Sequence, residues 1–179
     1  MTDLDVINFF SGKKEYRSLS NFWENDVVVD KRLYESGEHC FQGEKYTRLG
    51  EMCDEPRKSV LLEYGRTFMK PSPYTAAMAK KMGRRLVLTT TELEQWTSIS
   101  IEVQHGICAW KWTHYEEVKH DLLKSGNKIL IHPAMRCSQP EKRLWEGKGV
   151  IVDGKLVILG KNMLGTIWMM YRPSETMYP

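Results

Sequence analysis

Residues 36–46 hold the side chains whose types and spacing best suit chemistry, in the run SGEHCFQGEKY. On a helix, an offset of seven residues places Glu38 and Lys45 on one face, and Phe41 and Gln42 lie between them. A carboxylate and an amine that face one small molecule can carry out acid–base or imine chemistry. The alternative interpretation of this spacing is an exposed face with ordinary salt bridges.

Two other segments suit an anionic ligand. Residues 80–85, KKMGRR, form a basic helix end that either complements the helix dipole or binds phosphate. Residues 160–165, GKNMLG, precede a predicted helix N-terminus, which attracts anions, although most such turns only cap a helix. Trp96 has the spacing of a core residue, and stacking on a ligand is the alternative. The five histidines lack the spacing of metal ligands, so we expect no metal.

The composition is that of a globular chain about the size of one domain. The chain has 179 residues, of which 41% are hydrophobic and 27% charged, and this excludes a disordered or fibrous protein. A net charge of +3 permits a phosphate-bearing ligand but does not by itself indicate binding to nucleic acid. The longest apolar stretch, residues 163–171, is shorter than a membrane span. The four cysteines are scattered, so we expect a reducing compartment and no disulfide framework.

Apolar periodicity and capping signals predict a helix-rich chain. Helices are expected over residues 36–49, 54–62, 72–83, 91–110, 113–124 and 163–171. Ser36 should cap the first of them. Capping boxes are indicated by Thr91 with Glu94 and, further along, by Thr113 with Glu116. Asn162 should cap the last helix.

Strand signals are short and few. Strands are expected at residues 6–10 and 128–131, and hairpins at residues 27–34 and 150–159. The first hairpin should turn at Asp30-Lys31 and the second at Asp153-Gly154. Strands and helices do not alternate, which argues against a doubly wound parallel sheet. We therefore predict an α+β fold: a single, predominantly helical domain over residues 1–172, with a few short strands, a β-hairpin near the C-terminus and a short tail at residues 173–179.

Taken together, these segments resemble the NADAR family in order and approximate spacing across nearly the whole chain. The shared blocks are NFF at residues 8–10, SNF at 20–22, SGEHCFQ at 36–42 with Lys45, MGR at 82–84, Trp96, Trp145, GKNMLG at 160–165 and MMYR at 169–172. The block around Glu38 is specific to this family, and the combination of blocks is more specific still.

The resemblance implies a compact, mostly helical N-glycosidase that acts on ribosides without a metal or cofactor. By position, Glu38 matches the family's essential glutamate, and Lys45 matches a lysine suited to a nucleophilic, imine-forming role. The positions expected to bind the ligand are Asn21, Phe22, Phe41, Gly83, Arg84, Trp96, Trp145, Asn162, Leu164 and Gly165.

Three segments depart from the family's pattern. The family carries an acidic residue three positions before the tryptophan of a Trp-Gly-x-Gly loop, whereas this chain has Lys142 there. Glu141 and Glu146 are the two acids that could replace it, and the sequence leaves the choice open. The hairpin at residues 150–159 is extra relative to short bacterial members, and could cover the pocket or select the leaving base. Residues 131–134, IHPA, stand where many members have a threonine.

The leading hypothesis from the resemblance is a hydrolase that removes ADP-ribose from guanine bases of DNA or RNA through a lysine imine. Its binding partners would be ADP-ribose and ADP-ribosylated nucleic acid. The first alternative is an N-glycosidase of riboflavin-pathway ribosylamino-pyrimidine phosphates. The second is a non-catalytic module that binds ADP-ribose or NAD, against which the presence of both Glu38 and Lys45 argues. We expect a monomer that does not bind membranes, in the cytoplasm or alternatively in the nucleus.

Overall fold

The computed structural model describes residues 5–173, and the chain divides into two compact units. The central unit is the continuous segment Asn21–Thr113, and the terminal unit is formed by the two ends, Met1–Ser20 and His114–Pro179. One domain over residues 1–172 therefore stays a prediction. The tail expected at residues 173–179 lies, from residue 174 on, outside the described residues.

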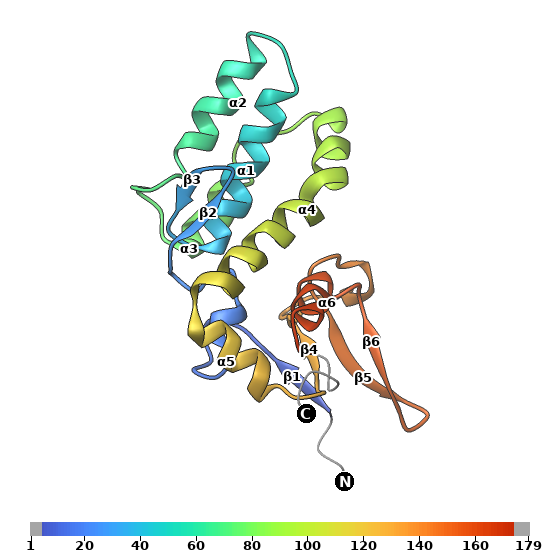
Figure 1. Cartoon of the computed structure of the whole chain (residues 1–179). Helices are drawn as coiled ribbons and strands as arrows, with labels where there is room; N and C mark the ends of the chain where they lie inside the picture. Colours follow the sequence, from blue (N-terminus) through green and yellow to red (C-terminus); the bar gives the residue numbers. More distant parts are fainter. Residues whose placement is uncertain (1–4, 174–179) are drawn as a thin grey trace. The chain divides into compact units, whose positions relative to one another are not determined.

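The central unit is helical with one small hairpin (Figure 1). Its elements are β2 (Val27–Val29), β3 (Arg32–Tyr34), α1 (Gly37–Glu51), α2 (Arg57–Arg66), α3 (Ala76–Met82) and α4 (Thr90–His114). The predicted hairpin is confirmed: β2 and β3 pair antiparallel, and the turn residues Asp30 and Lys31 have φ angles of 48° and 63°. Helix α1 packs against α2, α3 and both strands, so it lies inside this unit.

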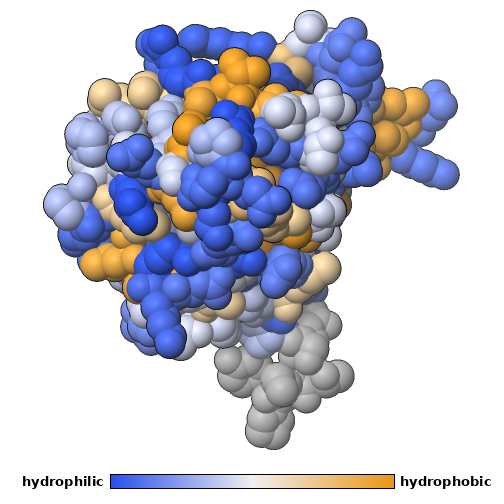
Figure 2. Space-filling view, turned by 90° about the horizontal axis from the view of Figure 1, so that it is seen from above, coloured by the Kyte–Doolittle hydropathy of each residue, from blue (hydrophilic) through white to orange (hydrophobic). Residues whose placement is uncertain are grey.

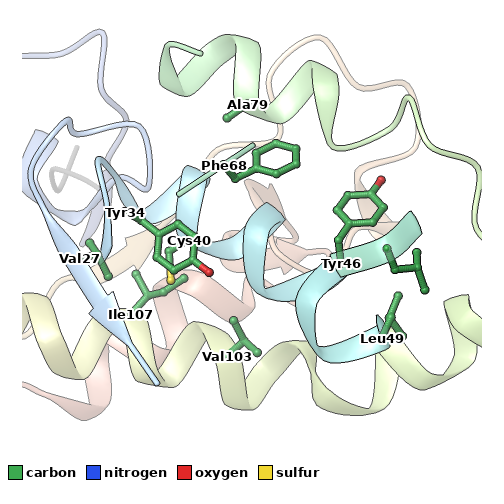
Figure 3. Packing of buried hydrophobic residues seen from close by; sticks show 10 residues of the cluster. Val27, Tyr34, Cys40, Tyr46, Leu49, Phe68, Ala79, Val103 and Ile107 are labelled. Atoms are coloured by element: carbon green, nitrogen blue, oxygen red, sulfur yellow. The ribbon is translucent and has the colours of Figure 1, made fainter. Parts of the chain in front are cut away.

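The core of the central unit surrounds α1. Figure 3 shows Val103 and Ile107 of α4 in the same cluster as Cys40, Tyr46 and Leu49 of α1. All five side chains are 0% exposed. Because apolar partners cover α1 from several sides, its polar side chains are enclosed as well.

The terminal unit combines short strands with two helices. Its elements are β1 (Val6–Asn8), the 3₁₀ helix η1 (Arg17–Leu19), α5 (Glu116–Lys124), β4 (Ile129–Ile131), the 3₁₀ helix η2 (Pro140–Lys142), β5 (Lys148–Val152), β6 (Lys155–Leu159) and α6 (Met163–Met170). Strands β1 and β4 pair in parallel, with Val6 opposite Ile129. The second predicted hairpin is confirmed as β5–β6, although β5 begins at Lys148, two residues before the predicted start. Helix α6 packs against β4, and α5 packs against η1.

The fold class is confirmed. Residues 5–173 contain six α-helices and three two-stranded sheets, so the chain is mostly helical with short strands. The four cysteines, all within this described part, are free thiols.

Several predicted helix starts were wrong by a few residues. Helix α3 begins at Ala76, not after Ser72-Pro73, because the hydroxyl of Thr75 accepts a hydrogen bond from the backbone N–H of Met78. Thr113 does not open a helix: its hydroxyl donates to the backbone oxygen of Ala109, inside α4.

The capping residue of α4 was predicted two residues too late. The capping box is formed by Thr89 and Glu92, whose side chains exchange hydrogen bonds with each other's backbone N–H groups. Thr91 and Glu94 therefore lie inside the helix that they were expected to cap.

The surface of the protein mixes polar and apolar side chains. On the face in Figure 2, hydrophobic residues form separate patches among hydrophilic ones. Within residues 5–173, no helix combines the length and apolar character needed to cross a membrane.

Candidate active site

Helix α1 begins at a fixed point, and this positions the predicted acid in its first turn. Ser36 has an extended backbone, and its hydroxyl accepts a hydrogen bond from the backbone N–H of His39, as the predicted cap requires. The ring of His39 bridges Ser36 Oγ, at 2.7 Å from Nδ1, and the backbone oxygen of Tyr74, at 2.8 Å from Nε2. The backbone N–H of Glu38 donates to the backbone oxygen of Asn21 over 2.8 Å. Both ends of this first turn are thus held by neighbouring segments.

Glu38 and Lys45 are both buried, which excludes an exposed salt-bridge face. Glu38 is 8% exposed and Lys45 is 9% exposed. A charged side chain in such a place is costly unless its surroundings compensate for the lost water. Both groups therefore have altered proton affinities.

Lys45 is held by a backbone carbonyl. Its Nζ donates a 2.6 Å hydrogen bond to the backbone oxygen of Gly83 and lies 5.0 Å from the centre of the Tyr46 ring. Burial lowers the pKa of Lys45 from 10.5 to about 8; the charge of Glu38 opposes this shift and that of Arg84 adds to it. A substantial fraction of the amine is therefore neutral near physiological pH.

Glu38 shifts in the opposite direction. Burial raises the pKa of this carboxyl above 4.5, although a hydrogen bond from Gln42 and the charges of Lys80 and Lys45 partly offset the effect. The side-chain Nε2 of Gln42 donates to Oε1 of Glu38 over 2.9 Å. A carboxyl whose protonated form is favoured by burial can act as an acid.

Gly83 contacts both Lys45 and Gln42, the residue that donates a hydrogen bond to Glu38. It ends α3, and its carbonyl oxygen accepts hydrogen bonds from Lys45 and from the hydroxyl of Tyr46, the latter at 2.8 Å. A β-carbon on Gly83 would overlap the amide of Gln42. The glycine predicted as a ligand contact thus has a structural role that the motif alone does not reveal.

Two aromatic contacts border the pair. Phe41 and Trp96 pack edge to face with ring centres 5.0 Å apart, and both are half-buried. The ammonium of Lys80 lies 5.6 Å from the centre of the Phe22 ring. Half-buried aromatic rings, one of them on the same helix as the acid and the amine, provide a surface on which a flat base can stack.

Arg84 and Asn21, two other positions predicted to contact the ligand, have different surroundings. Arg84 is exposed, as a contact to a charged ligand group requires. The side-chain amide of Asn21 is engaged with that of Gln104, with hydrogen bonds of 2.7 and 3.1 Å. It is the backbone oxygen of Asn21 that holds the start of α1, through the N–H of Glu38, and a ligand contact from its side chain stays a prediction.

The remaining predicted ligand residues belong to the terminal unit. They are Trp145, Asn162, Leu164 and Gly165. Asn162 is the N-cap residue of α6, as predicted, but its side chain makes no capping hydrogen bond. It has a left-handed backbone, and its amide accepts from the N–H of His132 and donates to the oxygen of Leu130. Gly165 packs against that same backbone oxygen of Leu130, which leaves no room for a β-carbon. Both residues thus join α6 to the end of β4.

The two acids considered as replacements for the family's acidic residue have different surroundings. Glu141 is exposed in η2, where Lys142 also lies. Glu146 is half-buried, with Oε2 3.5 Å from Nε of Arg143. Glu146 is the more enclosed of the two, and the role of either stays a prediction.

Sequence reasoning did not assign Gln42 and Lys80 to the site. Gln42 was visible as the residue one turn after Glu38 on the same helical face. Lys80 was noted only as part of a basic helix end, and its position near Phe22 depends on how α3 packs on α1. Among the described residues, no three His, Cys, Asp or Glu side chains gather as metal ligands.

Replacing Lys45 by methionine is expected to stabilise the folded protein by roughly 3 kcal/mol at pH 7. The reason is that burial lowers the pKa of this amine from 10.5 to about 8, and each pKa unit corresponds to about 1.4 kcal/mol. The unfolded chain binds this proton more tightly than the folded protein does. The destabilisation is therefore complete below pH 8 and disappears as the pH rises to about 10.5.

Denaturant unfolding at pH 7 and pH 10 measures this effect. The stability gap between Lys45→Met and the wild type should be smaller at pH 10. The exposed Lys81 of α3 provides the control, because Lys81→Met should change stability little at either pH. A gap that does not depend on pH would contradict the explanation.

The fold and the site together define the class of protein: a mostly helical α+β protein in which helix α1 buries an acid and an amine on one face. This agrees with comparisons with known proteins. The chain belongs to the NADAR domain family, whose model matches residues 8–174.

Several relatives and a solved structure are also similar to this chain. The chain is similar to the N-glycosidase YbiA of Escherichia coli (strain K12), with 28% identity over 167 residues that cover 93% of this chain and 86% of that protein. The N-glycosidase YbiA of Shigella flexneri matches with the same identity and coverage. An NMR structure of the E. coli protein YbiA matches with a TM-score of 0.59 and 24% identity, covering 96% of this chain and 84% of that chain. This structural likeness concerns the fold alone.

Proposed function

We propose that the protein is an N-glycosidase that removes ADP-ribose from guanine bases of DNA or RNA through a lysine imine. The observation that carries the proposal is the buried pair of Glu38 and Lys45 on one face of α1. Family membership and relatives named N-glycosidase support the cleavage of an N-glycosidic bond. Guanine as the leaving base and ADP-ribose as the sugar come from the family resemblance.

In the first step, the neutral amine of Lys45 attacks C1′ of the ribose. The bond between C1′ and the base nitrogen breaks, its electron pair goes to the base, and Glu38 gives its proton to that nitrogen. A neutral amine can keep one N–H on the backbone oxygen of Gly83 while its lone pair faces C1′. The lowered pKa of Lys45 and the raised pKa of Glu38 favour the two protonation states that this step needs.

In the second step, the ribose ring opens. Glu38, now a carboxylate, takes a proton from the lysine nitrogen and passes it to O4′ as the bond between C1′ and O4′ breaks and the imine forms. Water then adds to C1′ of the protonated imine. One of its protons goes to the lysine nitrogen as the bond from C1′ to that nitrogen breaks, and the other returns to Glu38 as the C1′ aldehyde forms. This releases ADP-ribose and restores the amine.

The residues proposed to bind the ligand are chosen by their exposure and by their match to the family's motif positions. Arg84 is the proposed contact for the diphosphate, because it is an exposed cation close enough to lower the pKa of Lys45. Trp96, fixed by its edge-to-face contact with Phe41, is the proposed stacking surface for a base. The other proposed ligand residues are Asn21, Phe22, Phe41, Gly83, Trp145, Asn162, Leu164 and Gly165, with Glu141 or Glu146 as an additional acid.

Turnover assays on two substrates test the proposal. Release of ADP-ribose from oligonucleotides that carry ADP-ribosylated guanine is the expected result. Cleavage of ribosylamino-pyrimidine phosphates alone would replace the substrate and keep the reaction class. Binding of ADP-ribose without turnover of either substrate would make the protein a non-catalytic module.

Free ADP-ribose is expected to raise the melting temperature of the protein. Binding to the folded state alone stabilises it by about 2.7 kcal/mol at a hundredfold excess over Kd, which for a chain of this size is roughly 5–10 °C. Differential scanning fluorimetry with millimolar ADP-ribose measures the shift. Arg84→Ala should reduce the shift, because Arg84 is the proposed diphosphate contact. No shift in the wild type would count against a nucleotide ligand.

A further inference from the structure

The side-chain amide of Gln42 lies between Glu38 and the glycine that ends α3. Gln42 is 7% exposed, and its Nε2 donates a 2.9 Å hydrogen bond to Oε1 of Glu38, one turn earlier on α1. Its own carbonyl oxygen is buried and has no hydrogen-bond partner among the described residues. A buried acceptor without a partner is destabilising, so the orientation of this amide calls for an explanation.

The orientation follows from what faces each end of the amide. If the amide were turned over while Glu38 is a carboxylate, its oxygen would face the carboxylate oxygen of Glu38, and its N–H groups would face the α-carbon of Gly83, which accepts no hydrogen bond. The observed orientation places the donor on the acid and the oxygen against Gly83. This orientation leaves one oxygen without a hydrogen bond, whereas the turned-over amide would leave its N–H groups without acceptors and place two oxygens against each other. The orientation found in the structure is therefore the less costly one.

Gly83 is required here for space rather than for its backbone conformation. Its φ angle is −61°, which any residue adopts. A β-carbon, however, would overlap both Oε1 and Cδ of Gln42. Any larger residue at this position must therefore displace the amide that contacts Glu38.

We propose that Gln42 is the positioning residue of Glu38 and that Gly83, by lacking a side chain, holds Gln42 in place. The proposal rests on the proposed function, since it concerns how Glu38 delivers its proton. The N–H of Gln42 occupies Oε1 of Glu38, and a proton on that oxygen would compete with this donor. The transferable proton is therefore carried by Oε2, and Gln42 determines which oxygen of the acid faces the leaving base.

The charges around Glu38 do not determine which of its two carboxyl oxygens carries the proton. They are Lys45 and His39 on α1 and Lys80 on α3, and each favours the carboxylate as a whole. Among the described residues, only Gln42 makes a direct hydrogen bond to the Glu38 carboxyl. Removing that bond should raise the pKa of Glu38, because it stabilises the charged form.

A carbon-13 NMR titration of the Glu38 carboxyl tests the proposal without requiring turnover. Gln42→Met keeps the length of the side chain and removes the donor, so the titration midpoint should move to higher pH. Gly83→Ala should move it in the same direction, because the new methyl group displaces the amide. Gly106→Ala is the control: on α4, a β-carbon there meets only Val29 at 3.7 Å, and the midpoint should stay in place. An unchanged midpoint in Gln42→Met, or no shift in Gly83→Ala, would overturn the proposal.

Turnover provides the second measurement. Gln42→Met should lower turnover about 10- to 100-fold with unchanged affinity for ADP-ribose, as the loss of one hydrogen bond to a charged group corresponds to that factor. In a Glu38→Gln background, Gln42→Met should cause no further loss if it acts through the acid, whereas a general structural effect would add to the first. Absence of turnover in the wild type would overturn the proposed function, while the NMR titration would still decide the role of Gln42.

Discussion

Borohydride added together with ADP-ribose is expected to attach one ADP-ribosyl unit to Lys45. An imine between Nζ and C1′ is reduced irreversibly to a stable amine, whereas direct attack of water on C1′ leaves nothing to reduce. Burial lowers the pKa of this amine to about 8, so enough neutral amine exists at pH 7–8 for the imine to form. Intact-mass spectrometry measures the added unit, and peptide mapping locates it.

Substitution of Lys45 is expected to abolish both the adduct and turnover. Lys45→Arg keeps a positive charge but cannot form the imine, so the comparison separates charge from nucleophilic attack. Lys81→Arg, on the exposed side of α3, should retain both the adduct and turnover. An adduct on Lys161 or Lys148 would relocate the nucleophile. If turnover persists without any adduct, the reaction is direct hydrolysis assisted by Glu38.

Replacing Glu38 by glutamine is expected to lower turnover by a factor on the order of 10²–10⁴, the usual contribution of a general acid–base group. The substitution keeps the shape of the side chain, and its carbonyl oxygen can still accept the hydrogen bond from Gln42. The fold and the affinity for ADP-ribose should therefore survive, and only proton transfer is lost.

Single-turnover kinetics and calorimetric binding of ADP-ribose separate these two quantities. Glu63→Gln, an exposed carboxyl on α2, is the matched control and should retain full turnover. Turnover near the wild-type rate in Glu38→Gln would remove Glu38 from the mechanism. A simultaneous loss of ADP-ribose binding would instead make Glu38 a ligand contact.

Local signals in the sequence predicted the elements that local interactions determine. The hairpin at Asp30-Lys31 and the one at Asp153-Gly154 were found because tight turns need residues that tolerate positive φ. Ser36 was found as the cap of α1 because its hydroxyl bonds a backbone N–H three residues ahead. The face of α1 that carries Glu38 and Lys45 followed from helical spacing alone.

The start of α4 shows where local signals fail. The run of three threonines at residues 89–91 offers two capping boxes of the same spacing. The structure uses Thr89 with Glu92, whose carboxylate also accepts two 2.8 Å hydrogen bonds from Arg57 on α2. A partner far away in the sequence therefore decides between two equivalent local patterns.

Burial of the site could not be predicted either. Helical spacing predicted which residues share a face of α1, including Gln42, but not the segments that cover that face, such as the one that carries Gly83. Gly83, which accepts the hydrogen bond of Lys45, is 38 residues further along the chain. Only after α3 packs on α1 do these polar groups lose their water and acquire altered pKa values.

The division of the chain into a continuous central unit and a split terminal unit has a consequence for its synthesis. Strand β1 leaves the ribosome early, but its partner β4 begins only at Ile129, so the β1–β4 sheet must wait for that residue. The central unit is complete once Thr113 has emerged, and it contains Glu38, Lys45 and every hydrogen-bond partner described for them. Because domains tend to fold as units during translation, we expect the acid–amine pair to assemble on the nascent chain before its two ends meet.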